Sequence, residues 1–166
     1  MLFHCTQKLS IKIPDCAATP LTDVSPLGSW HANLYRYSRR QCVLFCHDET
    51  RYCLLLAGLL KDDFAVAGHL QRELFLASLR ALDVPATTLK RVTLALGPVQ
   101  FDCNTNRSVL GGLRTADIDL SWLICDTPIL ECDPLKLCLQ LNQRPTSIKG
   151  RYLMPQRAML ERVAQL

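Results

Sequence analysis

The chain lacks the long apolar segments that membrane and secreted proteins carry. No run approaches the roughly 18 consecutive apolar residues that a membrane-spanning helix needs. The first eight residues contain no basic stretch followed by an apolar one, so they are not typical of a secretory signal. From these absences we expect a cytoplasmic protein that does not bind a membrane.

Common nucleotide-binding and hydrolase motifs are missing as well. Neither GxxxxGK[ST] nor GxGxxG occurs, and no serine lies in a G-x-S-x-G sequence. The chain has no internal repeat and no low-complexity tract. We therefore expect no bound cofactor, and the sequence does not decide whether the protein is an enzyme.

The nine cysteines do not have the spacing of a metal or redox site. Their number is odd, and no Cys-x-x-Cys pair is present. On a strand, Cys42 and Cys46 would lie about 13 Å apart, which is too far for one tetrahedral metal ion. Most of the cysteines are flanked by apolar residues, and a buried free cysteine behaves as a small hydrophobe. We interpret them as core residues in a reducing compartment, with metal binding and redox use as less favoured alternatives.

Length and composition are those of one globular domain. The chain has 166 residues, of which 49% are hydrophobic and 20% are charged. Its net charge of +4 is located in a basic C-terminal segment, residues 142–166, where five basic residues face one acidic residue. We expect a single domain over residues 1–166, with a charge distribution compatible with a polyanionic partner such as nucleic acid.

Hydrophobic periodicity predicts an α+β fold. Residues 30–37 alternate with period two, residues 41–47 are almost continuously apolar, and residues 51–56 resume after a polar turn. These three segments are typical of an antiparallel meander. We expect an antiparallel sheet, built around this N-terminal meander, that is packed by helices from the middle and C-terminal parts of the chain. Further strands are expected over residues 2–5 and 99–103, and a loop over residues 14–28.

Capping residues and helical spacing indicate the helices. The expected ranges are 8–13, 62–81, 85–96, 134–141 and 155–164. Residues 115–125 are ambiguous, because their alternation indicates a strand whereas Thr115 as an N-cap indicates a helix. We favour the helix. Residues 104–112 read as a polar turn followed by a flexible Gly111-Gly112 junction.

The first candidate for chemistry is the sequence Trp30-His31-Ala32-Asn33. His31 and Asn33 share one face of the expected strand. A histidine is the natural general base near neutral pH, and an asparagine beside it could orient a substrate. A histidine on a half-buried strand also often bonds a neighbouring loop. In that alternative Trp30 is simply a core residue.

Arginines form the second group of candidates. Arg40 lies at the turn before the central strand of the meander, and Arg51 lies at the turn after it. Arginine is suited to bidentate phosphate binding, although exposed arginines on turns are commonly solvated surface. Because the two turns lie at opposite ends of the strand, these arginines are not expected to converge on one anion.

The third candidate lies in the stretch over residues 104–112. Arg107 and Ser108 follow an expected strand and precede a glycine pair. Such a loop can bind an anion through its backbone N–H groups and the arginine. A polar turn that only positions the next helix explains the same residues equally well.

Several ordered motifs resemble a bacterial domain family of unknown function. They are FHCTQKL at residues 3–9, WHAN at 30–33, RR at 39–40, TRY at 50–52 and NRSVLG at 106–111. The resemblance covers residues 1 to about 145. The chain departs from the family at His47, where asparagine is usual, and at Gly112-Leu113, which replaces SMND. The resemblance implies no activity, cofactor or partner.

Three functional hypotheses follow. The favoured one is a protein that binds a phosphate-bearing ligand, above all nucleic acid. Its candidate residues are Trp30, His31, Asn33, Arg40, Arg51, Arg107 and Ser108. The second hypothesis is a small metal-independent nuclease or transferase with His31 as general base and an arginine that stabilises the transition state. The third is a protein–protein interaction module without an anion site.

Overall fold

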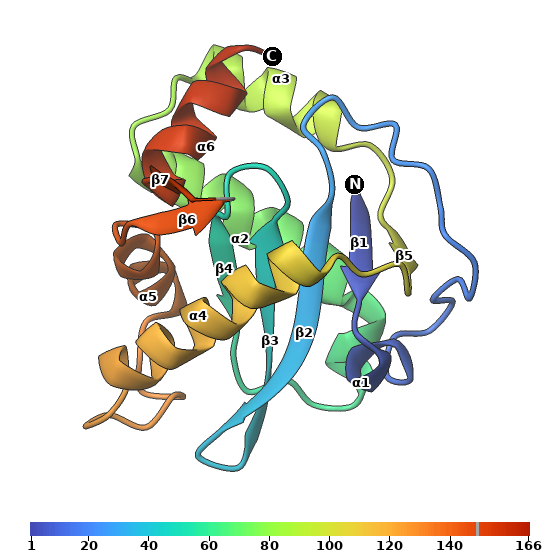
Figure 1. Cartoon of the computed structure of the whole chain (residues 1–166), viewed down its shortest axis with the longest axis vertical. Helices are drawn as coiled ribbons and strands as arrows, with labels where there is room; N and C mark the ends of the chain where they lie inside the picture. The colour runs from blue at the N-terminus through green and yellow to red at the C-terminus, as the bar shows by residue number, and fades with distance from the viewer. Residues whose placement is uncertain (149) are drawn as a thin grey trace.

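A five-stranded sheet is the centre of the fold in the computed structural model, which describes residues 1–148 and 150–166 (Figure 1). The spatial order of its strands is β4-β3-β2-β1-β5. The strands are β1 (Leu2–Cys5), β2 (Trp30–Tyr37), β3 (Arg40–His47), β4 (Cys53–Leu56) and β5 (Gln100–Asp102). The meander β2-β3-β4 is antiparallel as predicted, whereas β1 pairs in parallel with both β2 and β5. The sheet is therefore mixed, within the expected α+β class.

One face of the sheet is covered by helices from the middle of the chain. They are the 3₁₀ helix η1 (Asp62–Val66) and α2 (Ala67–Ala81), and α3 (Ala86–Leu96) packs against α2. All three match the predicted ranges. Trp30 and Phe3 point into this aromatic core, where the Trp30 ring lies 5.3 Å from that of Phe75 in α2. Gly68 lets α2 begin against the sheet edge, because a Cβ there would lie 2.9 Å from Phe101. The packing on this face is that of an ordinary hydrophobic core.

The opposite face carries the C-terminal half of the chain. α4 (Arg107–Leu123) crosses in front of β2 and β3, and α5 (Pro134–Leu141) lies beside β4 (Figure 1). Asn142, just after α5, is buried and pairs with the backbone of the edge strand: Cys53 N–H donates to its Oδ1, and its Nδ2 donates to Cys53 O, both at 2.7 Å. These bonds satisfy part of an edge that would otherwise be open.

Two local predictions are wrong, and both concern short-range signals. α1 (Gln7–Ser10) is shorter than the helix expected over residues 8–13. α4 begins at Arg107, so residues 107–112 are helical rather than a turn and a flexible junction. The helical interpretation of residues 115–125 is right up to Leu123, but the N-cap is Asn106, whose side chain accepts from Ser108 N–H. Thr115 lies inside the helix.

The C-terminal part contains one predicted and one unpredicted feature. α5 and α6 (Pro155–Ala164) begin at the prolines that the sequence indicated. Between them, β6 (Thr146–Ile148) and β7 (Arg151–Leu153) form a separate antiparallel pair that the sequence analysis did not predict. In the part of the chain that the structure describes, no helix is long and apolar enough to cross a membrane.

Candidate functional site

A row of polar and sulfur-containing side chains crosses the sheet beneath α4. Strand register aligns Asp102, His4, His31, Cys46 and Cys53, one from each strand. All five residues are at least 90% buried. Buried ionisable groups are costly unless they are paired, and they concentrate at functional sites. The row therefore marks the polar centre of an otherwise apolar sheet.

His4 and Asp102 form the first hydrogen-bonded pair of this row. His4 Nδ1 lies 2.6 Å from Asp102 Oδ1. The carboxylate is fully buried and also accepts backbone N–H groups from Asn104 at 3.0 Å and Leu21 at 2.8 Å. These donors fix the position of the carboxylate, which in turn orients the His4 ring through Nδ1. Among the residues that the structure describes, none bonds His4 Nε2, and the His4 side chain is 10% exposed.

His31 and Asp48 form a second pair on the neighbouring strand. His31 Nδ1 lies 2.7 Å from Asp48 Oδ1, and Asn106 N–H donates to His31 Nε2 at 2.6 Å. Both ring nitrogens are thus engaged by partners inside the fold. Burial alone would raise the pKa of the Asp48 carboxyl, but the hydrogen bonds from His31 and Ser29 outweigh it and hold that pKa below its usual value.

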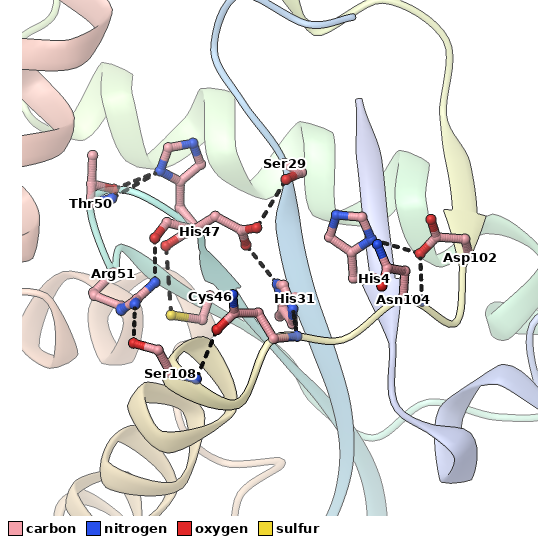
Figure 2. Close-up of polar contacts among 12 residues, drawn as sticks. His4, Ser29, His31, Cys46, His47, Thr50, Arg51, Asp102, Asn104 and Ser108 are labelled. Atoms are coloured by element: carbon pink, nitrogen blue, oxygen red, sulfur yellow. Dashed lines mark hydrogen bonds and ion pairs between the residues drawn. The ribbon is translucent and has the colours of Figure 1, made fainter. Parts of the chain in front are cut away.

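The two imidazoles lie next to each other, with ring centroids 4.9 Å apart (Figure 2). The connector from β5 into α4 passes along both of them. Asp102 holds His4, and the backbone of Asn106 holds His31. Between these inward contacts Cys103 and Thr105 are exposed to solvent, and so is Arg107 just after them. The site is thus built by β1, β2, β5, the β3–β4 turn and the start of α4.

Two of the predicted residues, Arg51 and Ser108, meet at the start of α4. Arg51 is only 5% exposed, and its Nη1 donates to the backbone carbonyl of Asp48. Its Nη2 donates to Ser108 Oγ at 3.0 Å (Figure 2). The pair joins the β3–β4 turn to the first turn of α4. His31 and Arg51 both bond Asp48, and Ser108 bonds Arg51. Three of the sequence candidates therefore converge, but through bonds to each other and to Asp48.

The other predicted residues do not join this cluster in the same way. Trp30 is fully buried on the α2 face of the sheet. Arg40 pairs with Tyr37 at the far end of β3 and is exposed, away from Arg51 as the meander implies. Asn33 is half-buried on the His31 face, where its Oδ1 accepts from Thr6 Oγ at 2.6 Å. Arg107 is exposed beside the cluster, at the first position of α4.

Sequence reasoning missed His4, Asp48 and Asp102. A signal for His4 was present, because His4-Cys5-Thr6 repeats the spacing of His31-Ala32-Asn33, and each places two polar residues on one strand face. The two segments do lie side by side in register. No local signal marks Asp102, since it reaches His4 only through the parallel pairing of β1 with β5.

Comparison with known protein families identifies the family of this chain. The chain belongs to the family described as Domain of unknown function (DUF6933), whose model matches residues 2–158. This confirms the resemblance to a family of unknown function. The sequence has no significant match among curated proteins.

Proposed function

We propose that this protein acts on a phosphate-bearing substrate in a metal-independent acid–base reaction, with His4 as the general base and acid. The observation that carries the proposal is the oriented imidazole of His4, whose Nε2 is open while Nδ1 is held by a buried carboxylate. His31, the base expected from the sequence, has no free nitrogen and becomes a positioning residue.

The chemistry follows from the tautomer that Asp102 imposes. With the proton on Nδ1, the lone pair of Nε2 faces outward and takes a proton from an attacking hydroxyl or water. The resulting imidazolium is stabilised by the ionised Asp102, which has its own backbone donors. The attacking and leaving oxygens lie on opposite sides of phosphorus in an in-line displacement. One histidine therefore acts as base in a first step and returns the proton as acid in a second step.

The start of α4 supports a phosphate-bearing substrate. α4 has 17 residues, and its N-terminal end lies against His31 through the Asn106 N–H. A helix N-terminus carries partial positive charge, and the exposed Arg107 at its first position adds a full charge. His31 fixes this end of the helix beside His4 and so places positive charge next to the proton-transfer group.

Nucleic-acid binding without turnover is a second candidate. Arg107 and Arg114 are both exposed and lie two turns apart on the same side of α4, a spacing that suits contacts to successive phosphates. Such binding would weaken steeply with salt. It would use Arg107 but not the open nitrogen of His4.

Phosphoester hydrolysis in the presence of EDTA tests the proposal. The substrates are bis(p-nitrophenyl) phosphate and a labelled single-stranded RNA of mixed sequence. His4→Gln should lower kcat by about 10²- to 10⁴-fold, the usual contribution of a positioned acid–base group. Asp102→Asn should lower kcat with little change in KM, because it disturbs the tautomer rather than binding. His69→Gln, at an exposed histidine of α2, is the matched control and should be unchanged.

The outcomes separate the two candidates. Turnover that survives His4→Gln, or its absence from the unmodified protein with every phosphoester, overturns the enzymatic proposal. Salt-dependent RNA binding that is lost in Arg107→Ala and retained in His4→Gln, without turnover, identifies the binding function instead.

A further inference from the structure

Three cysteines gather beside Asp102 at the end of β5. Cys16 Sγ and Cys103 Sγ lie 3.8 Å apart although the residues are 87 positions apart in the chain. Cys103 is exposed, Cys16 is half-buried, and Cys5 is buried next to Cys16. Of the three, only Cys16 and Cys103 are open to a reagent from solvent.

Backbone contacts bring the two segments that carry these thiols side by side. Ala17 N–H donates to Phe101 O at 2.9 Å, and Ala17 forms a parallel bridge with Asp102. The residues that precede Ala17 and follow Asp102 are Cys16 and Cys103. In this parallel bridge Cys16 is level with Phe101 and Cys103 is level with Ala18, so the two cysteines are diagonal neighbours on one face of the paired segments. Their sulfur atoms approach across that diagonal.

We propose that Cys16 and Cys103 form a reversible disulfide when the protein meets a low-molecular-weight disulfide such as glutathione disulfide. The Sγ atoms have to close from 3.8 Å to a bond length of about 2.05 Å, and Cys103, which has to move for this, is exposed. The site is a thiol modification site, and its reagent class is a small disulfide.

The exchange proceeds in two balanced steps. The thiolate of Cys103 attacks one sulfur of glutathione disulfide, the S–S bond of the reagent breaks, and one glutathione leaves as a thiol. The thiolate of Cys16 then attacks Cys103 Sγ, which releases the second glutathione. The protein loses two thiol protons and two electrons, and the reagent gains both.

Exposure decides which thiol reacts first. Burial, followed by the neighbouring Cys103, raises the pKa of Cys16 to about 11, so Cys16 is a poor nucleophile toward reagents in solution. Once Cys103 is in a mixed disulfide it carries no charge, and its contribution to that raised pKa disappears. The second step is then intramolecular between adjacent sulfurs, and high effective concentration compensates for the small thiolate fraction of Cys16.

The bond would fix the segment that helps to hold Asp102. Leu21 N–H, five residues beyond Cys16, donates to Asp102 Oδ2. A cross-link between Cys16 and Cys103 restrains this segment at the β5 end of the polar row. Oxidation should therefore slow amide exchange at Leu21.

The test treats the full chain with glutathione disulfide and maps the products by mass spectrometry. The unmodified protein should lose about 2 Da and yield a peptide that joins Cys16 to Cys103, a change that dithiothreitol reverses. Its Tm should rise by about 10 °C, because the bond closes a long loop in the unfolded chain. Hydrogen exchange at Leu21 should slow in the same sample.

Three variants make the result decisive. Cys16→Ser should stop at a glutathione adduct on Cys103, and Cys103→Ser should give neither adduct nor cross-link at Cys16. Cys125→Ser removes another exposed cysteine and should still form the cross-link. The proposal is overturned if the unmodified protein gives only stable adducts, equally at Cys103 and Cys125, or if the linked peptide joins any other pair.

Discussion

The two histidine–aspartate pairs share the same Nδ1–Oδ1 contact and differ in the bonding of the second ring nitrogen, Nε2. In both, the Nδ1–Oδ1 distance is short, 2.6 Å for His4 with Asp102 and 2.7 Å for His31 with Asp48. His31 Nε2 accepts the backbone N–H of Asn106, whereas His4 Nε2 has no bond among the described residues. We call the His31–Asp48 pair on β2 closed, because both ring nitrogens have partners. The His4–Asp102 pair on β1 is open, because Nε2 has no partner among the described residues.

This difference at Nε2 gives the two histidines different roles: His31 is structural, and His4 is available for chemistry. A closed pair joins elements of the fold: His31 links the β3–β4 turn, through Asp48, to the start of α4. An open pair contributes less to the fold but keeps a nitrogen for proton transfer. Replacing each histidine should therefore have opposite consequences for stability and for function, and this expectation can be measured.

The largest expected effect is on the stability contributed by the closed pair. His31→Ala should lower the free energy of unfolding by about 4 kcal/mol, because it leaves a cavity and strips the Asp48 carboxylate and the Asn106 N–H of a partner. His4→Ala should cost about 2 kcal/mol, since Asp102 keeps two backbone donors. Urea unfolding of both variants near neutral pH measures the difference.

Equal losses in the two variants would contradict the comparison. They would mean that His4 Nε2 is also engaged in holding the fold, and the proposed base would lose its free nitrogen. A larger loss for His4→Ala than for His31→Ala would reverse the assignment of roles.

A third histidine, like His31, has a hydrogen-bond partner at each ring nitrogen. His47 is fully buried; its Nε2 lies 2.9 Å from Leu27 O, and Thr50 N–H donates to its Nδ1 at 3.2 Å. Burial lowers the pKa of His47 from the ordinary 6.5 to about 4. Nδ1 also lies 2.9 Å from Thr50 Oγ1, so both nitrogens of the buried ring have partners inside the fold.

This histidine should make the protein sensitive to mild acid. Below pH 6.5 the unfolded chain takes up a proton at His47, and the folded chain does not until the pH nears 4. Stability is therefore complete above that window and falls within it, by about 3 kcal/mol in total. The lowered pKa of Asp48 adds a further loss below its usual value of 3.8. Urea unfolding across this pH range measures the slope.

Two substitutions test whether His47 causes this change of the free energy of unfolding with pH. His47→Gln, which has no titrating group, should flatten it, although the variant starts from a lower stability. His69→Gln, at an exposed position, should keep the slope of the unmodified protein. A slope that persists in His47→Gln would assign the acid sensitivity to other groups.

The sequence predicts what depends on neighbours along the chain. The meander follows from period-two alternation and a polar turn, and the same alternation places His31 and Asn33 on one face. The open pair is different, because Asp102 meets His4 only when strands far apart in the chain align in parallel. Parallel pairing leaves no turn signal in the sequence, so half of the site could not be found from local patterns.

The start of α4 shows how tertiary contact overrides local preference. A glycine pair at residues 111 and 112 normally weakens a helix, which led to the prediction of a flexible junction. In the structure the helix runs through both, and a Cβ at Gly112 would lie 3.2 Å from Arg51 Cδ. The glycine admits the buried arginine that bonds Ser108, so the residue that looked like a break allows the helix to pack.

The smallest expected effect tests where this helix begins. Asn106→Ala removes the side-chain oxygen that accepts from Ser108 N–H and should cost about 1 kcal/mol of stability, the usual value of an N-cap. Thr115→Ala is the matched control, because Thr115 is exposed inside the helix and donates only to Gly111 O at 3.2 Å; its cost should stay within about 0.5 kcal/mol. The backbone N–H of residue 106 still reaches His31 in the alanine variant, so the closed pair should survive and the loss should stay well below that of His31→Ala. A larger cost at Thr115 than at Asn106 would move the helix start back to the position that the sequence first indicated, and Arg107 would then no longer lie at a helix N-terminus beside the two histidines.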